Sequence, residues 1–291
     1  MRKISILLLA LPLMFSCADS NSQYVRQAIR IMDKQGLFAD GPDWEAARTA
    51  ALSAKPVSLE DAQDRVRAAA KVAGGKHSFL QSAGSVVSDA TSAWPAPAVT
   101  FSEGGIPVVS LPHFSGNRDE GVKYASAVLS AIPEDTPGVV IDLRGNTGGN
   151  MYPMIAAVHR FLPDEDGMLR FRTRKRTQWI PLSYAVQTAG VQQRSRIDCP
   201  VAILTDSLTA SSGEATLICF RGLDYVRVFG GPTAGYASAN QPFPLPGGDH
   251  LVLTTACDVA RTGEVYCDDP IAPDVLTETP LEDALAWLKK P

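Results

Sequence analysis

Two adjacent serines, Ser211 and Ser212, lie in the stretch LTASSGEATLICFRG among residues with little side-chain bulk. The preceding VAILTD has the continuous apolar pattern of a buried strand, and the following EATLICF is typical of a helix. A serine on a tight strand-to-helix turn exposes its hydroxyl, and the helix start offers free backbone N–H groups to an oxyanion. The stretch therefore suits nucleophilic catalysis, although a serine turn that only caps a helix fits the same residues.

A second turn could complete such a site. The stretch VVIDLRGNTGGN, residues 139–150, runs from a buried strand into Gly148 and Gly149, where backbone amides can approach a ligand closely. An amide there, paired with that of Ser212, would form an oxyanion hole with two donors. A phosphate-binding loop is the other interpretation, but the GxxxxGK[ST] and GxGxxG spacings are both missing.

In combination, four stretches resemble the C-terminal processing, or tail-specific, serine peptidases, a family that includes the core of tricorn protease. They are GGKHSFL, VVIDLRGNTGGN, ILTDSLTASSGEA and FGGPTAG, and the resemblance covers about residues 70–275. It implies a serine peptidase with a crotonase-like (ββα superhelix) α/β core that hydrolyses peptide or protein substrates without a metal or cofactor. By motif, it assigns the nucleophile to Ser211, the oxyanion donors to Gly149 and Ser212, and supporting roles to Gly148, Glu214 and Thr233.

The resemblance also implies a general base. Many members have a lysine directly after the glycine of a PTxGK segment, but this chain has Tyr236 there, which rules out a Ser/Lys dyad at that position. In the tricorn-like branch an upstream histidine is the base, and His77 in KHSFL stands at the matching place. An acid should hold the imidazole tautomer. Asp268 is the preferred acid, with Glu264, Asp269 and Asp274 as rivals and Ser78 as a possible relay.

The resemblance also bears on domain content and on whether the chain is catalytic. Processing peptidases usually carry a PDZ domain before the catalytic core, and residues 78–100 are too few for one, so the resemblance is to a compact, PDZ-less member of the tricorn-like branch. The same fold family has members that bind peptides or apolar ligands without hydrolysing them. A non-catalytic binding protein is therefore the alternative function.

The elements that would position these residues alternate along the chain. After Phe101, apolar strands such as GVVIDLRG alternate with helices such as MYPMIAAVHRFL, which predicts βαβ crossovers and a largely parallel sheet. Before it, three helical patterns begin near Ser22, near Asp43 and at Ser58, where Asp61 completes a capping-box pattern. We expect a signal segment at 1–17, a helical subdomain at 21–87, a linker loop at 88–100 and the catalytic core at 101–291.

One expected strand is unusual in its charge. In RFRTRKR, alternation would place four arginines on one face, namely Arg170, Arg172, Arg174 and Arg176. An edge strand protected by charge is the favoured interpretation. A seat for a carboxylate, such as a peptide C-terminus, is the alternative.

The chain has 291 residues, of which 45% are hydrophobic, and a formal net charge of −4, so it carries no basic footprint for nucleic acid. Its first residues, MRKISILLLALPLMFSC, have the charged start and short apolar run of a secretory signal. Cys17 resembles the lipidated cysteine of a bacterial lipoprotein box, with ordinary signal cleavage as the alternative. We expect an exported protein, periplasmic or lipid-anchored to the outer membrane, whose oligomeric state stays open.

Four further cysteines are present, which in an exported chain suggests disulfides. Cys257 and Cys267 flank a strand–turn–strand pattern, which favours pairing them. Cys199 with Cys219 then follows by elimination, although four cysteines allow three pairings. A metal site is the weaker interpretation, because the chain has no CxxC and its four histidines are scattered.

Overall fold

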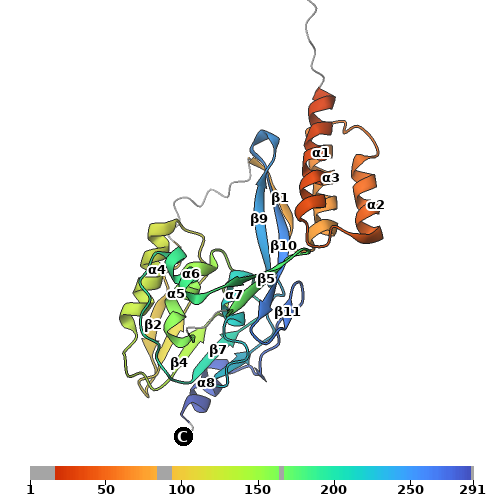
Figure 1. Ribbon diagram of the computed structural model, residues 1–291. Coiled ribbons are helices and arrows are strands. Elements are labelled where there is room, and N and C mark those ends of the chain that lie inside the picture. Colours follow the sequence, from red (N-terminus) through yellow and green to blue (C-terminus); the bar gives the residue numbers. More distant parts are fainter. Residues whose placement is uncertain (1–16, 84–93, 164–166, 290–291) are drawn as a thin grey trace, which may run out of the picture.

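The computed structural model describes residues 17–83, 94–163 and 167–289, so most of the expected signal segment lies outside the described residues. The same holds for residues 84–87 of the expected helical subdomain and 88–93 of the expected linker. Three helices form the N-terminal part, as predicted, and lie to one side of the remaining chain (Figure 1). Ser58 caps the third helix by accepting a hydrogen bond from the backbone N–H of Asp61 at 3.0 Å. The helices are α1 (Cys17–Gln35), α2 (Gly41–Leu52) and α3 (Leu59–Gly74).

A six-stranded sheet forms the core of the larger part, in the order β12-β8-β7-β4-β3-β2. All its pairings are parallel except that of β2 with β3, which confirms the predicted parallel sheet. The expected loop at 88–100 ends early, because its last residues enter β2 and pair with β3. The strands are β2 (Ala98–Phe101), β3 (Pro107–Ser110), β4 (Val139–Asp142), β7 (Val201–Thr205), β8 (Val226–Gly230) and β12 (Val275–Leu276).

Both faces of this sheet are covered by helices. Alternation along β4 sends Val139 and Ile141 into the large core beneath α4, α5 and α7, whereas Val140 packs into a smaller core with Leu288 of α8. Burial on both faces explains why these strands are continuous apolar runs. The helices are α4 (Arg118–Ala131), α5 (Met151–Val158), α6 (Leu182–Ala189), α7 (Ser212–Ile218) and α8 (Pro280–Leu288), with a 3-10 turn at His159–Phe161.

A second sheet is antiparallel and is organised around the long strand β10. Leu251 and Leu253 of β10 belong to the same buried cluster as the apolar faces of the N-terminal helices, while its C-terminal half pairs with β5. This strand therefore connects the helical part to the core (Figure 1). The strands are β1 (Phe79–Gln81), β5 (Leu169–Arg172), β6 (Thr177–Ile180), β9 (Ser238–Pro244), β10 (His250–Ala260) and β11 (Val265–Tyr266), with a 3-10 turn at Pro246–Gly248.

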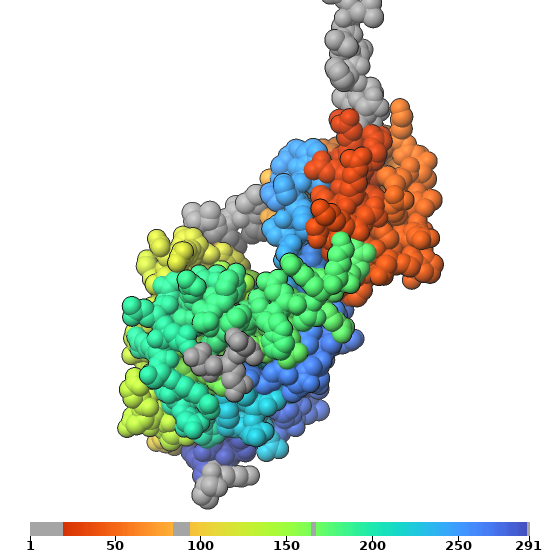
Figure 2. Space-filling view, viewed as in Figure 1, coloured from red at the N-terminus to blue at the C-terminus, as the bar shows by residue number. Residues whose placement is uncertain are grey.

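The arginine-rich stretch is a hairpin rather than the single edge strand predicted. Strand β5 ends at Arg172 and lies between β10 and β6, so it is not at an edge. The turn that follows reaches the N-terminal helices, where the Arg174 guanidinium donates to the carbonyls of Ala39 and Asp33 at 2.6 and 2.7 Å. Figure 2 shows this green turn lying against the red and orange helices. Arg174 thus joins the two parts of the molecule.

Among the described residues, we find no helix that combines the length and the apolar character required to cross a bilayer.

Candidate active site

Ser211 lies at the sharp turn between β7 and α7. Its φ is 52° and its ψ is −114°, and it is the one non-glycine residue with positive φ in the described part of the chain. This backbone is strained for a residue with a Cβ and persists only where its surroundings fix it. Ala210 N donates to the carbonyl of Asn146 at 2.8 Å, and Ser211 N donates to Glu214 Oε2 at 2.8 Å. The turn is therefore held on both sides of the serine.

The glycine turn lies directly against this serine. Gly148 and Gly149 have φ values of 101° and 112°, which glycine alone adopts readily. A Cβ on Gly148 would lie 2.8 Å from the Cβ of Ser211, and one on Gly149 would lie 2.0 Å from the carbonyl oxygen of Phe114. Ser212 Oγ also donates to the carbonyl of Gly149 at 2.6 Å. The two turns can approach this closely because both residues lack side chains.

Two backbone N–H groups remain free where the turns meet. Within the described residues, those of Gly149 and Ser212 donate to no other group. The N–H of Gly148, in contrast, donates to Asn146 Oδ1 at 2.9 Å. Gly149 and Ser212 are the two donors that the sequence predicts for an oxyanion hole. Sequence reasoning missed the supporting Asn146, whose fully buried amide also donates to Leu111 O at 2.7 Å.

Glu214 holds the backbone of the serine turn through its carboxylate. Its side chain is fully buried, and its carboxylate accepts four hydrogen bonds. Burial raises the pKa of this carboxyl, while the hydrogen bonds oppose that rise by stabilising the charged form. The donors are Thr233 Oγ1 and Gly235 N on Oε1, and Ser211 N and Tyr236 N on Oε2. Glu214 therefore joins the serine turn to the segment 233–236.

His77 reaches the same region from the connection between α3 and β1. Its ring lies edge-on to that of Tyr236, with the centroids 5.1 Å apart, and the N–H of Tyr236 shares one carboxylate oxygen with that of Ser211. Its Nδ1 lies 3.0 Å from Ser238 Oγ. In the tautomer whose Nδ1–H donates to this hydroxyl, Nε2 carries the lone pair that can accept a proton. No hydrogen bond joins His77 to Ser211 within the described residues. Such contacts are often long in unliganded enzymes and shorten when substrate binds.

The environment of His77 keeps its imidazole neutral. Burial, and then the charge of Lys76, lower its pKa to about 4, whereas a hydrogen bond to the backbone of Ser238 opposes this change. Lys76 Nζ lies 4.5 Å from the centroid of the Tyr236 ring and donates to the carbonyl of Ala234 at 3.3 Å. The imidazole is therefore in its proton-accepting form at pH 7.

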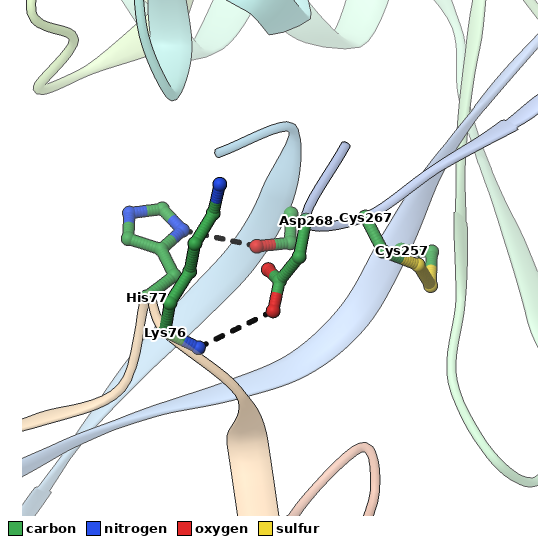
Figure 3. The surroundings of a disulfide bond; sticks show 6 residues. Lys76, His77, Cys257, Cys267 and Asp268 are labelled. Atoms are coloured by element: carbon green, nitrogen blue, oxygen red, sulfur yellow. Dashed lines mark hydrogen bonds between the residues drawn. A yellow bond between two sulfur atoms is a disulfide. The ribbon is translucent and has the colours of Figure 1, made fainter. Parts of the chain in front are cut away.

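Asp268 is placed differently from the sequence prediction. Its Oδ2 accepts the backbone N–H of Lys76 at 3.2 Å (Figure 3). The partner of Nδ1 of His77 is instead Ser238. Sequence reasoning missed Ser238, because a lone serine in YASAN carries no local signal. The suggested relay, Ser78, is buried and hydrogen-bonded to Thr254.

Two of the rival acids are also engaged elsewhere. Glu264 accepts a hydrogen bond from the hydroxyl of Tyr266 at 2.8 Å, and Asp274 pairs with Arg221 at 3.0 Å.

The cysteines divide into one disulfide and two thiols. Cys257 and Cys267 are paired, with their Cα atoms 4.8 Å apart. Cys199 and Cys219 are both free and buried, so the pairing inferred by elimination is wrong. Cys219 directly follows α7, and its Sγ donates to the carbonyl of Ala215 at 3.2 Å inside the large core. Across residues 17–83, 94–163 and 167–289, no group of three or more His, Cys, Asp or Glu side chains could hold a metal ion.

Known proteins share both the sequence pattern and the fold. The sequence profile of peptidase family S41 matches residues 105–277. A nisin-resistance protein of Lactococcus lactis subsp. lactis is 32% identical over 281 residues, which span 93% of this chain and 87% of that protein. The match therefore extends over the N-terminal helices as well as the core.

Solved structures give the same result. A lipoprotein from Streptococcus agalactiae superposes with a TM-score of 0.83 at 29% identity, covering 98% of this chain and 99% of that one. The photosystem II D1 C-terminal processing protease superposes with a TM-score of 0.64, covering 93% of this chain and 98% of that one. At 14% identity, this second likeness shows a common α/β fold.

Proposed function

The chain belongs to peptidase family S41, and from this premise we propose that it is an exported serine peptidase with Ser211 as nucleophile and His77 as general base. One observation carries the proposal. Ser211 occupies a strained turn at the start of α7, and the free amides of Gly149 and Ser212 lie beside it. A turn of this kind presents a hydroxyl and two oxyanion donors to one substrate carbonyl.

The chemistry follows from these positions. Nε2 of His77 accepts the proton of Ser211 Oγ as that oxygen bonds to the carbonyl carbon of a peptide. The carbonyl oxygen becomes an oxyanion, which accepts hydrogen bonds from the amides of Gly149 and Ser212. His77 then gives its proton to the departing amine, which leaves an acyl-enzyme. Water then attacks the carbonyl carbon of that ester while His77 takes a proton from it. The bond from this carbon to Ser211 Oγ breaks, His77 returns the proton to Oγ, and the free carboxylic acid leaves.

Ser238 and Glu214 have supporting roles in this mechanism. In this mechanism the Nδ1–H of His77 donates a hydrogen bond to Ser238 Oγ, so the lone pair of the neutral ring lies on Nε2. Glu214 holds the amide of Ser211 and, through Tyr236 and Thr233, the chain that packs against His77. Burial, and then the charge of Lys76, lower the pKa of the imidazole, which favours the neutral base.

Labelling by a fluorophosphonate probe tests the proposal without knowledge of the substrate. We expect the purified protein to be labelled, and Ser211→Ala to abolish labelling. His77→Ala should slow it by roughly 10³-fold or more, since an unactivated serine is a poor nucleophile. Ser207→Ala, in the same connection after β7, is the matched control. Equal labelling of wild type and Ser211→Ala would remove the assignment, and no labelling of either would favour a ligand-binding protein.

The relative's name suggests a first peptide to test. Because that protein of Lactococcus lactis is a nisin-resistance protein, we propose incubation with nisin and mass spectrometry of the products. Cleavage by wild type but not by Ser211→Ala would identify a peptide substrate.

We also propose that the protein is exported and tethered through Cys17. The charged start, apolar run and Ser16-Cys17 support this, as does the likeness to a streptococcal lipoprotein. In cells fed a clickable fatty acid, wild type should carry lipid and Cys17→Ser should not. A lipid-free wild type would indicate ordinary signal cleavage.

A further inference from the structure

A short segment, residues 267–271, connects the base region with the nucleophile region. At one end, Cys267 is bonded to Cys257 of β10. At the other end, Ile271 N donates to Thr233 Oγ1 at 2.8 Å, and Thr233 N donates to Ile271 O at 3.1 Å. Thr233 Oγ1 in turn donates to Glu214, which holds the amide of Ser211. Both ends of the segment are thus fixed.

The middle of the segment touches the chain that carries the base. Asp268 Oδ2 accepts the backbone N–H of Lys76, the residue before His77, at 3.2 Å (Figure 3). A Cβ on Gly75 would lie 2.3 Å from that same oxygen, and one on Gly235 would lie 2.7 Å from Pro270 N. Gly75 and Gly235 lie on either side of the segment. Because they have no side chains, the segment fits between the stretch that carries His77 and the stretch that ends at Tyr236.

The contact made by Asp268 is with the backbone and not with the imidazole. Its Oδ1 is buried without a hydrogen-bond partner among the described residues, and Ser238 occupies Nδ1 of His77. The contribution of this side chain is therefore a hydrogen-bond acceptor at Oδ2 for the N–H of Lys76. Among the described residues, no hydrogen bond joins this carboxylate to the ring.

We propose that the 267–271 segment, closed by the Cys257–Cys267 disulfide, positions the base, with Asp268 as a positioning residue that holds the Lys76–His77 backbone toward Ser211. The inference rests on the proposed roles of Ser211 and His77. It goes beyond them by assigning a functional purpose to the disulfide and to an acid that does not touch the reacting groups.

Two substitutions at residue 268 separate this role from that of a charged triad acid. Asp268→Asn keeps an oxygen that can accept the Lys76 N–H, whereas Asp268→Ala removes it. We expect fluorophosphonate labelling to slow by roughly 30-fold in Asp268→Ala, because small misplacement of a catalytic group is costly. Labelling in Asp268→Asn should stay within about threefold of wild type.

A triad acid gives the opposite result for the conservative change, since its amide variant loses about 10⁴-fold. A loss of that size in Asp268→Asn would overturn the proposal, and so would wild-type labelling in Asp268→Ala. Circular dichroism and the melting temperature report whether each variant is folded. The acid limb of the pH–labelling profile should keep its position in Asp268→Asn, because Oδ2 is not paired with the ring.

The disulfide is tested by a matched pair of double variants. Cys257→Ser/Cys267→Ser releases one end of the segment, and Cys199→Ser/Cys219→Ser changes two buried thiols that form no bridge. We expect labelling about tenfold slower in the first and unchanged in the second. Dithiothreitol supplies two electrons and two protons to the bridge, giving two thiols and cyclic oxidised dithiothreitol. It should slow the wild type equally and have no effect on Cys257→Ser/Cys267→Ser.

The outcomes distinguish this inference from the proposed function. Labelling that needs Ser211 and His77 but is unaffected by Asp268→Ala, by loss of the bridge and by dithiothreitol overturns only the positioning role. Labelling that persists in Ser211→Ala overturns the proposed function, and this inference with it.

Discussion

Ser211 lies in a turn whose backbone is fixed from several directions, whereas His77 lies in a connection that three distant side chains hold. Around the serine, Glu214, Asn146 and the glycine turn make short contacts inside one continuous core. The base is attached to Ser238 through its ring, to Asn240 through its carbonyl at 2.9 Å, and to Asp268 through the preceding amide. The strand that follows His77, β1, has three residues and belongs to the other sheet.

This difference matches two requirements: the oxyanion hole beside Ser211 must be rigid, whereas His77 must only be held in the right place. An oxyanion hole stabilises charge only if its amides already point at the oxygen, so that half of the site is built into the sheet and α7. The proposed base must move protons between two partners, and two of its supports, Ser238 and Asn240, come from β9, which pairs with β10. We therefore expect changes on the nucleophile side to affect both stability and reactivity. Changes on the base side should affect mainly reactivity.

Glu214→Gln is expected to have the largest effect. A glutamine amide would direct N–H groups at two of the four donors, which leaves buried donors unsatisfied. We expect a loss of about 3 kcal/mol in the free energy of unfolding, measured in urea. Fluorophosphonate labelling should slow by roughly 100-fold as the Ser211 amide shifts.

Glu264→Gln is the control, because Glu264 is exposed and hydrogen-bonded to the neighbouring Tyr266. It should match wild type in both measurements. Wild-type stability in Glu214→Gln would show that the nucleophile turn is held by other contacts, and the contrast between the two regions would fail.

Sequence alone predicts the nucleophile side better than the base side, for a physical reason. Ser211 and Gly149 follow buried strands at tight turns, so their surroundings are encoded by neighbouring residues. The partner of His77 is Ser238, 161 positions away, and nothing near either residue indicates the pairing. The sequence does not predict the contact of Asp268, because its partner is the backbone amide of Lys76 and such a contact has no signature in sequence.

Two sequence predictions that the structure contradicts, a disulfide and a strand, fail for the same reason. Pairing Cys199 with Cys219 assumed that every cysteine of an exported chain is oxidised, yet helix packing buries Cys219 as a thiol. Placing Arg174 on a strand assumed regular alternation through a stretch that turns after Arg172. In both cases tertiary contacts decide what the local pattern leaves open.

Gly149→Ala is expected to have the next largest effect. Its Cβ would collide with Phe114 O, and any shift that relieves the collision would move the amide proposed as an oxyanion donor. Loss of one such donor slows acyl transfer by about 10²-fold or more, and labelling should fall accordingly. Gly105→Ala is the control, because Gly105 also has positive φ, 75°, but open space around it. It should cost about 1 kcal/mol of stability and leave labelling unchanged.

Arg174→Ala tests how the helical part is attached. Its guanidinium makes two hydrogen bonds to carbonyls of the N-terminal helices and their connection, and losing them should cost about 1 kcal/mol of unfolding free energy. Arg176→Ala, in the same exposed turn, should cost little. Urea titration measures both, and equal stability of the two variants would show that Arg174 does not join the two parts.

Lys76→Met should have the smallest effect, a shift of the acid limb in the pH profile of labelling. Burial and then the Lys76 charge hold the pKa of His77 at about 4, so the free enzyme should keep its neutral base down to that pH. Between pH 4 and 6.5 the unfolded chain binds a proton at this histidine that the folded chain does not. Stability should therefore rise with pH across that window and fall as the solution is acidified.

Removing the cation should raise the pKa of His77, by roughly half a unit since Lys76 is exposed, and move the acid limb to higher pH. The acid nearest this chain, Asp268, binds the Lys76 amide and not the ring, and the other faces of the imidazole meet Tyr236 and Ser238, so no second charged contact should mask the shift. Lys71→Met, in the last turn of α3, is the control and should leave the acid limb in place. An unmoved limb in Lys76→Met would mean that burial alone keeps the base neutral, and that the base side depends on placement without electrostatic tuning.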